Sequence, residues 1–170
     1  MEIKYYRKLK NIERLSGTFK HRSYNLLEHQ YMVAVLFRHF ASKDNVPYDI
    51  NVLDLVMHHD ILEVETGDLI HTVKSLNDVT KDSWNKIEEE ILKEHFQLGK
   101  YSDEALKSGM STLQHKLFKA CDVLDLWIFS KEEVSIGNKN KNLIDVIGRC
   151  EKLIPRDFHS INKFMADYDS

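Results

Sequence analysis

The sequence of 170 residues has a formal net charge of −3, with 42% hydrophobic and 30% charged residues. This length is typical of one globular unit with a core of its own, and we expect a single domain over residues 1–170. The slight negative charge gives no general attraction for phosphate backbones, which argues against a protein that coats nucleic acids. An anionic substrate must then be bound by a few placed cations or by a metal ion.

The first half of the chain predicts helices separated by short loops. Two prolines and six glycines are too few turn residues for a many-stranded β fold, so we expect an all-α protein. Apolar residues recur at helical spacing over residues 26–41, and a loop is expected at 44–48. Asn51 is the expected N-cap of a second helix over residues 52–65, which Gly67 ends.

The second half of the chain continues the helical pattern. An amphipathic helix is predicted within residues 81–96. A loop near 98–102 then leads through residues 103–108 to a strongly apolar helix over 113–129. A polar loop then precedes a last helix at 143–153. The residues after Pro155 are expected to dock loosely or to fray.

The cysteines and the apolar runs indicate the cellular compartment. Cys121 and Cys150 lie in apolar helical segments without the spacing of a metal finger, so we expect buried free thiols. The first residues lack the apolar core of a signal peptide, and no run of about 18 apolar residues occurs. We therefore expect a cytoplasmic protein that has no membrane or nucleic-acid partner.

The adjacent pair His59 and Asp60 is the first candidate for chemistry. It lies within the apolar segment predicted as the second helix, where an imidazole and a carboxylate are costly unless something pairs with them. Alone, a histidine on a core face is more often a hydrogen-bonded structural residue than a metal ligand. The pair by itself therefore favours a structural interpretation.

Two further residues change that interpretation. His29 is in helical register with Val33, Leu36 and Phe40, so it should point inward, and Asp122 lies within a strongly apolar helix. Two imidazoles and two carboxylates from three helices form a mixed nitrogen and oxygen set. Such a set suits a divalent ion with positions left for water, and is compatible with manganese, cobalt, iron, zinc or magnesium.

Glu63 is the candidate catalytic carboxylate. It follows His59 by four residues, so a continuous helix would place it on nearly the same face, one turn on. A carboxylate within reach of a metal-activated water can exchange a proton with the attacking or leaving oxygen. The alternative for Glu63 is a solvated surface acid. His58 should point elsewhere, because one residue rotates the side chain by about 100° on a helix.

Three segments resemble the HD-domain phosphohydrolases, and within them the small 5′-deoxynucleotidases of the YfbR type. The most specific is HHDILEVETGDLIHTVK, from His58 to Lys74, which looks like the family's HD, glutamate and GDL block followed by a lysine. The LLEH ending at His29 is similar to the family's first histidine segment, and KACDVLDLW fits the segment with the last aspartate. The resemblance covers about Glu13 to Ile154 and implies a compact helical HD-domain bundle.

The resemblance implies roles for individual residues. The metal ligands would be His29, His59, Asp60 and Asp122, and Glu63 would be the catalytic carboxylate.

Three further residues are implied to bind substrate. Arg14 falls where the family has a phosphate-contacting arginine, Asp68 matches an aspartate that lies against the deoxyribose, and Lys74 would meet the phosphate. Each of the three also has an interpretation as a surface charge.

The chain departs from the family pattern around the base and the sugar. Leu15 stands where relatives carry tryptophan, and residues 70–73 replace the prolines common after GDL. His71 and Tyr31 are candidates to line the altered pocket, although a surface position for His71 and a core position for Tyr31 are favoured.

The resemblance implies a small nucleotide substrate and leaves two reactions open. The first is removal of phosphate from deoxynucleoside 5′-monophosphates. The second follows from a likeness to the small phage HD enzymes and is hydrolysis of deoxynucleoside triphosphates with release of tripolyphosphate. A cyclic-dinucleotide phosphodiesterase is disfavoured, because neither a GYP motif nor extra ligand histidines accompany the HD pair.

Alternatives from other classes are a catalytically inactive nucleotide-binding module and a plain helical interaction module. Glu63 argues against the first, and four metal-ligand types on apolar faces argue against the second. Family members are commonly dimers, so a homo-oligomer is possible here. Trp127 and Phe129 are expected either in the core or in an apolar dimer contact.

Overall fold

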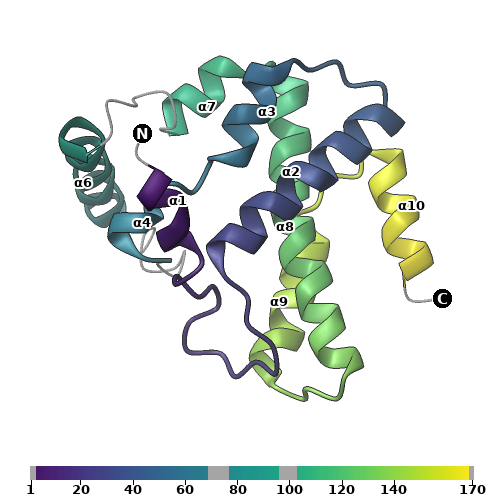
Figure 1. Cartoon of the computed structure of the whole chain (residues 1–170). Coiled ribbons are helices and arrows are strands. Elements are labelled where there is room, and N and C mark those ends of the chain that lie inside the picture. Colours follow the sequence, from purple (N-terminus) through teal and green to yellow (C-terminus); the bar gives the residue numbers. More distant parts are fainter. Residues whose placement is uncertain (1–2, 69–76, 96–102, 169–170) are drawn as a thin grey trace.

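Helices joined by turns and loops form the fold, as the composition predicted, with a long loop between the first two helices (Figure 1). The computed structural model describes residues 3–68, 77–95 and 103–168. Over these ranges the non-helical pairing consists of an isolated antiparallel β-bridge between Glu13 and Asn25. The helices are α1 (Ile3–Leu9), α2 (Leu26–Lys43), α3 (Ile50–Met57), α4 (Glu63–Thr66), α6 (Asp78–His95), α7 (Asp103–Gly109), α8 (Thr112–Ser135), α9 (Lys141–Leu153) and α10 (His159–Tyr168).

The centre of the molecule is the crossing of α2 and α8, with α9 packed along α8 and α3 against α2 (Figure 1). Apolar side chains from these helices form one core cluster, which includes Phe37, Phe40, Leu117, Phe118 and Leu124. Full burial of a side chain of this size stabilises the fold by about 1.5–3 kcal/mol. The helices that later carry the site are therefore held by the best-packed part of the protein.

The register of α2 agrees with the prediction from its apolar spacing. Asn25 caps the helix by accepting a hydrogen bond from the backbone N of Glu28 at 3.0 Å. His29 lies one turn in and is buried on the same face as Val33. Tyr31 falls on the opposite face and exposes 62% of its surface, so the expected core position was wrong.

The predicted helix over residues 52–65 is interrupted in the structure. Asp49, not Asn51, caps α3, because its Oδ1 accepts from the backbone N of Asn51 and of Val52, each at 3.0 Å. The helix ends at Met57, and turns occupy residues 58–62 before α4 begins. Gly67, at φ 73°, ends α4 as predicted.

Side-chain hydrogen bonds explain the interruption. His58 Nδ1 donates to the carbonyl of Asp54 at 2.7 Å, and His59 Nδ1 donates to the carbonyl of Val56 at 2.8 Å. The buried Gln30 amide of α2, oriented so that its nitrogen faces an acceptor, donates to the carbonyl of Met57 at 3.3 Å. A continuing helix would need these carbonyls for its own backbone N–H groups, so the side chains compete with the helix and end it.

The C-terminal residues form a docked helix, and the expected fraying after Pro155 was wrong. Phe158 and Ile161 are buried in the core, and α10 packs on α2. Ser160 Oγ donates to Asp44 Oδ2 at 2.6 Å, which ties α10 to the end of α2. Two apolar anchors and one charge-assisted hydrogen bond outweigh the polar composition of this segment.

The remaining expectations concern burial. Cys121 and Cys150 are free and buried, as predicted, and burial raises the pKa of the Cys150 thiol to about 12. Trp127 and Phe129 are both buried, which agrees with the core position rather than an exposed dimer contact. Among the described residues we find no helix with the length and apolar character that a bilayer span requires.

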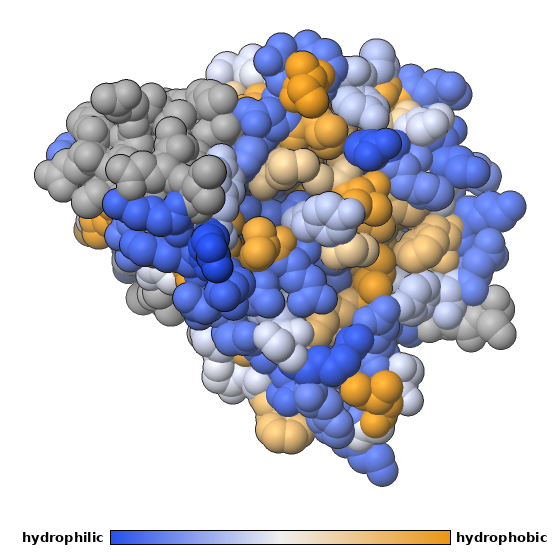
Figure 2. Space-filling view, in the orientation of Figure 1, coloured by the Kyte–Doolittle hydropathy of each residue, from blue (hydrophilic) through white to orange (hydrophobic). Residues whose placement is uncertain are grey.

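The surface around α2 carries both apolar and hydrophilic side chains, which are interspersed in the view of Figure 2. Along α2 the exposed apolar residues are Leu27, Tyr31 and Val35.

Candidate metal centre

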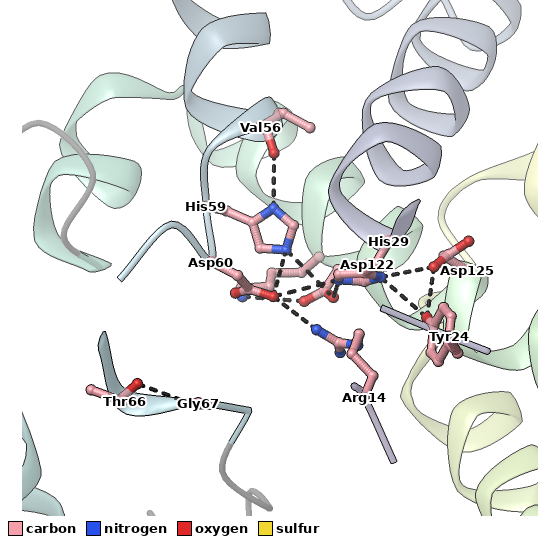
Figure 3. Close-up of polar contacts among 11 residues, drawn as sticks. Arg14, Tyr24, His29, Val56, His59, Asp60, Thr66, Gly67, Asp122 and Asp125 are labelled. Carbon is pink, nitrogen blue, oxygen red and sulfur yellow. Dashed lines mark hydrogen bonds and ion pairs between the residues drawn. The ribbon is translucent and has the colours of Figure 1, made fainter. Parts of the chain in front are cut away.

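Four side chains from three parts of the fold converge beside the crossing of α2 and α8 (Figure 3). His29 comes from α2, His59 and Asp60 from the turns after α3, and Asp122 from α8. His29 Nε2 lies 3.2 Å from Asp122 Oδ1 and 3.5 Å from Asp60 Oδ2. His59 Nε2 lies 3.2 Å from Asp60 Oδ2 and 3.9 Å from Asp122 Oδ1. The structure therefore brings together the four residues that the sequence singled out.

Hydrogen bonds at Nδ1 fix the orientation of both imidazoles. His59 Nδ1 donates to the Val56 carbonyl, and His29 Nδ1 donates to Asp125 Oδ2, each at 2.8 Å. In a neutral ring the other nitrogen, Nε2, then carries a lone pair. Both Nε2 lone pairs are aimed at the two carboxylates.

The donor set fits a divalent cation. Both Nε2 atoms are buried and make no hydrogen bond with any residue in the described ranges. One ligand atom from each of His29, His59 and Asp122 lies within 4.8 Å of the others. Buried polar atoms without partners are costly, whereas two imidazole nitrogens and two carboxylates are ordinary ligands of zinc and similar ions.

Charges keep both aspartates ionised. Burial raises the pKa of Asp60, but the neighbouring His59 and Arg14 outweigh it and hold that pKa well below its usual range. Burial likewise acts against ionisation of Asp122, and Lys119 and His29 lower the pKa of that carboxyl overall. Two anions therefore face the imidazoles, as a cation site requires.

Arg14 lies at the edge of this cluster. Its Nη1 donates to Asp60 Oδ2 at 2.9 Å, and its backbone N donates to the Tyr24 carbonyl at 2.7 Å. Burial lowers the pKa of the guanidinium, but Tyr24, Asp60, Asp122 and Asp68 together raise it. Asp68 is half-buried and close enough for its charge to act on Arg14.

Glu63 is the first residue of α4 and is buried, so the interpretation as a solvated surface acid was wrong. Its backbone N donates to the carbonyl of Asp60 at 3.0 Å, so it follows the HD pair directly through a turn. The expected continuous helix between them is absent from this described segment. Lys74 and His71 lie outside the described residues.

Three residues around the cluster were not among those predicted from the sequence. Asp125 accepts from His29 Nδ1, and Tyr24 Oη donates to Asp125 Oδ2 at 2.6 Å. Lys119 Nζ lies 3.4 Å from Asp122 Oδ2. Asp125 and Lys119 each stand three residues from Asp122 on α8, so helical spacing contained a signal for both. Tyr24 lies in a loop, where no periodicity could indicate it.

Solved structures of known proteins share this fold. An HD-domain phosphohydrolase from Listeria innocua is 23% identical, with a TM-score of 0.74 over 96% of this chain and 83% of that chain. The cyanophage S-2L HD phosphohydrolase DatZ, bound to dA and one catalytic Zn2+ ion, is 20% identical, with a TM-score of 0.69 over 92% of this chain and 84% of its own. The PH0347 protein from Pyrococcus horikoshii is 21% identical, with a TM-score of 0.71 over 98% and 93%.

The same helical HD architecture is therefore present here. No curated protein matches the chain. The family model described as 5′-deoxynucleotidase YfbR-like matches residues 3–168. Since this match spans nearly the whole sequence, the chain belongs to the YfbR-like 5′-deoxynucleotidase family.

Proposed function

We propose that this protein removes the phosphate from deoxynucleoside 5′-monophosphates and releases the deoxynucleoside and orthophosphate. The family makes the chain a metal-dependent phosphohydrolase that acts on small nucleotides. The observation that carries the finer proposal is the buried cluster of His29, His59, Asp60 and Asp122 with Arg14 beside it. It combines a cation site with a donor suited to phosphate.

The four cluster residues would hold the metal ion. When bound, a divalent ion supplies Lewis-acid stabilisation of phosphoryl charge and lowers the pKa of a coordinated water. The Zn2+ in the DatZ structure makes zinc one candidate for this chain, beside manganese, cobalt, iron and magnesium.

Arg14 would bind the phosphate oxygens. Its Nε is buried and makes no hydrogen bond within the described part of the chain, while Nη1 is held by Asp60. Guanidinium groups bind phosphate through two parallel N–H bonds, and the transfer of Asp60 to a cation would release the second donor. The ion pair between Asp60 and Arg14 would thus be replaced by a bond from Asp60 to the cation and by hydrogen bonds from Arg14 to the phosphate.

Glu63 would move the proton. Its carboxylate is buried directly after the HD turn, where it can accept a proton from the attacking water and return one to the leaving 5′-oxygen. Asp68 would lie against the deoxyribose and disfavour a 2′-hydroxyl, and Lys74 would contact the phosphate. Cys121 and Cys150, both free, are consistent with a cytoplasmic enzyme.

One observation favours a second reaction, the release of tripolyphosphate from deoxynucleoside triphosphates. Lys119 exposes 49% of its side chain beside Asp122, so a further cation borders the cluster. A longer phosphate chain would use such a cation for its distal groups.

Product analysis tests the proposal. Metal-stripped protein resupplied with manganese, cobalt, zinc or magnesium is assayed against panels of dNMP, NMP and dNTP, with Glu63→Gln as the matched control. Deoxynucleoside and orthophosphate from dNMP, lost in Glu63→Gln, support the deoxynucleotidase. Tripolyphosphate from dNTP supports the second reaction. Absence of turnover with every metal contradicts both and indicates a nucleotide-binding module.

A further inference from the structure

A buried network of hydrogen-bonded side chains lies behind His29, on the side away from the candidate metal centre (Figure 3). His29 Nδ1 donates to Asp125 Oδ2 at 2.8 Å, and Tyr24 Oη donates to the same oxygen at 2.6 Å. Asp125 exposes 5% of its surface, Tyr24 2% and His29 none. Asp125 is therefore a buried acid that lies about one helical turn after Asp122 on α8 and accepts a hydrogen bond from His29.

Aromatic stacking holds this network in place. The Tyr24 ring stacks on Phe129, with 4.2 Å between ring centroids and an interplanar angle of 11°. Asp125 and Phe129 stand four residues apart on α8, so one helix face presents both the carboxylate and the stacking surface. Rotation of Tyr24 away from Asp125 would break the stack as well as the hydrogen bond.

The hydrogen bond to Asp125 determines which ring nitrogen of His29 carries the proton. An ionised carboxylate only accepts hydrogen bonds, so Asp125 requires the proton of a neutral His29 to be on Nδ1. The lone pair then lies on Nε2, which faces Asp60 and Asp122. The opposite tautomer would direct an N–H at the cation site and could not ligate a metal.

A purely structural role does not account for Asp125. Burial of a carboxylate is costly, and an apolar residue at this position on α8 would fill the core without that cost. The Tyr24 carbonyl also accepts a hydrogen bond from the backbone N of Arg14, so the residue that supports Asp125 is tied to the segment that carries Arg14.

We infer that Asp125 and Tyr24 are positioning residues for metal binding, which hold His29 in the Nδ1–H tautomer with Nε2 directed at the ion. Neither residue would itself be a ligand of the ion. The inference rests on the proposed metal centre and extends it to a carboxylate and a phenol behind one ligand. Partners of this kind typically account for 10- to 100-fold in metal affinity, which sets the expected effect at about that size.

Metal affinity and the histidine tautomer test the inference directly. Zn2+ and Co2+ affinities are measured on the full chain by competition with a chromophoric chelator, and the tautomer by ¹⁵N NMR of the metal-free protein. Asp125→Asn should lower affinity by about 10- to 100-fold, because its amide can donate to Nδ1 and shift the proton to Nε2. The exposed Asp145→Asn on α9 is the matched control and should leave both readouts unchanged.

Tyr24→Phe keeps the stacked ring and removes one hydrogen bond, so it decides the matter if Asp125→Asn fails to fold. It should lower Zn2+ affinity by a few-fold and change the Co2+ absorption spectrum. Wild-type affinity in folded Tyr24→Phe, or wild-type affinity together with an Nδ1–H signal in folded Asp125→Asn, would overturn the inference. Normal metal binding without dNMP hydrolysis would contradict the proposed reaction and leave this inference intact.

Discussion

Arg14 and Asp60 are 46 residues apart in the sequence and form a partly buried ion pair, with 2.9 Å between Nη1 and Oδ2. Asp60 is at once a candidate metal ligand and the partner of the candidate phosphate-binding cation. A metal ion bound there would compete with Arg14 for the same carboxylate oxygen, and substrate phosphate would take up the guanidinium once the ion held Asp60. This exchange would make the guanidinium of Arg14 available to substrate phosphate only when the metal is bound.

Replacement of Arg14 should affect metal and substrate in opposite directions. Arg14→Gln removes the competitor of the metal at Asp60, so Zn2+ affinity should rise by a few-fold. It also removes the bidentate phosphate donor, so kcat/KM for dNMP should fall by about 100-fold. Calorimetric metal titration and steady-state kinetics check the two effects, with the exposed Arg149→Gln as control. If the Zn2+ affinity falls together with kcat/KM, the loop that carries Arg14 has misfolded instead.

Glu63→Gln should separate chemistry from binding. The amide preserves the size of the buried side chain but cannot accept a proton, so kcat should fall by about 10²- to 10⁴-fold. Metal affinity should stay within about twofold, because Glu63 is not among the proposed ligands. The measurement pairs kcat with a chelator-competition titration. Full activity in this variant would assign the proton transfer to another group.

Metal removal should lower the stability of the protein. An ion that binds only the folded chain at a concentration about 100 times its Kd stabilises it by about 2.7 kcal/mol. Thermal unfolding with and without a chelator should therefore show a higher Tm for the loaded protein. Asp122→Asn should reduce this metal-induced shift and leave the metal-free Tm close to that of the wild type. Identical melting curves in wild type with and without metal count against a specific site.

Glu133 should stabilise the loop that leads to Tyr24. Its buried carboxylate accepts from the backbone N of His21 at 2.6 Å, from the N and Nε of Arg22 at 3.1 Å each, and from Asn138 Nδ2 at 2.9 Å. Hydrogen bonds to charged groups contribute about 1.5–3 kcal/mol each. Each oxygen of Glu133 accepts two of these bonds, so the amide nitrogen introduced by Glu133→Gln should cost roughly two of them. Urea unfolding at neutral pH measures the difference, with the exposed Glu89→Gln on α6 as comparison.

The same carboxylate predicts a pH dependence of stability. Burial raises the pKa of Glu133, but the hydrogen bonds from His21, Asn138 and Arg22 outweigh it and lower the pKa below the unfolded value of 4.5. A lowered folded pKa gives stabilisation that is present above the unfolded pKa and lost as pH falls through the folded one. The gap in unfolding free energy between wild type and Glu133→Gln should thus narrow below pH 4.5. A gap that stays constant down to acid pH would contradict this account.

Residues on long regular helices could be predicted from the sequence. The apolar spacing of α2 placed His29 inward, and the apolar pattern of α8 placed Asp122 near the core, because each helix is long enough for its periodicity to be unambiguous. The metal cluster followed from these two residues and the HD pair. The family resemblance added Arg14, which the structure brings to the cluster.

Local competition for backbone carbonyls could not be predicted. The HD segment is apolar enough to be read as one helix, but the rings of His58 and His59 and the amide of Gln30 take carbonyls that the helix would need. Gln30 belongs to another helix, so only the tertiary structure brings it there. The burial of Tyr24 and Asp125 against His29 depends in the same way on the packing of a loop on α8.

Titration of metal-stripped protein with Mn2+, Co2+ or Zn2+, with orthophosphate release from dNMP followed in wild type and in Asp122→Asn, measures whether the buried cluster holds the ion that hydrolysis requires. We expect wild-type activity to rise from zero to a plateau when a single ion is bound per chain, and Asp122→Asn to need far more metal or to stay inactive. Metal-independent release, or equal titration curves for the two proteins, would contradict a metal-dependent reaction at this cluster.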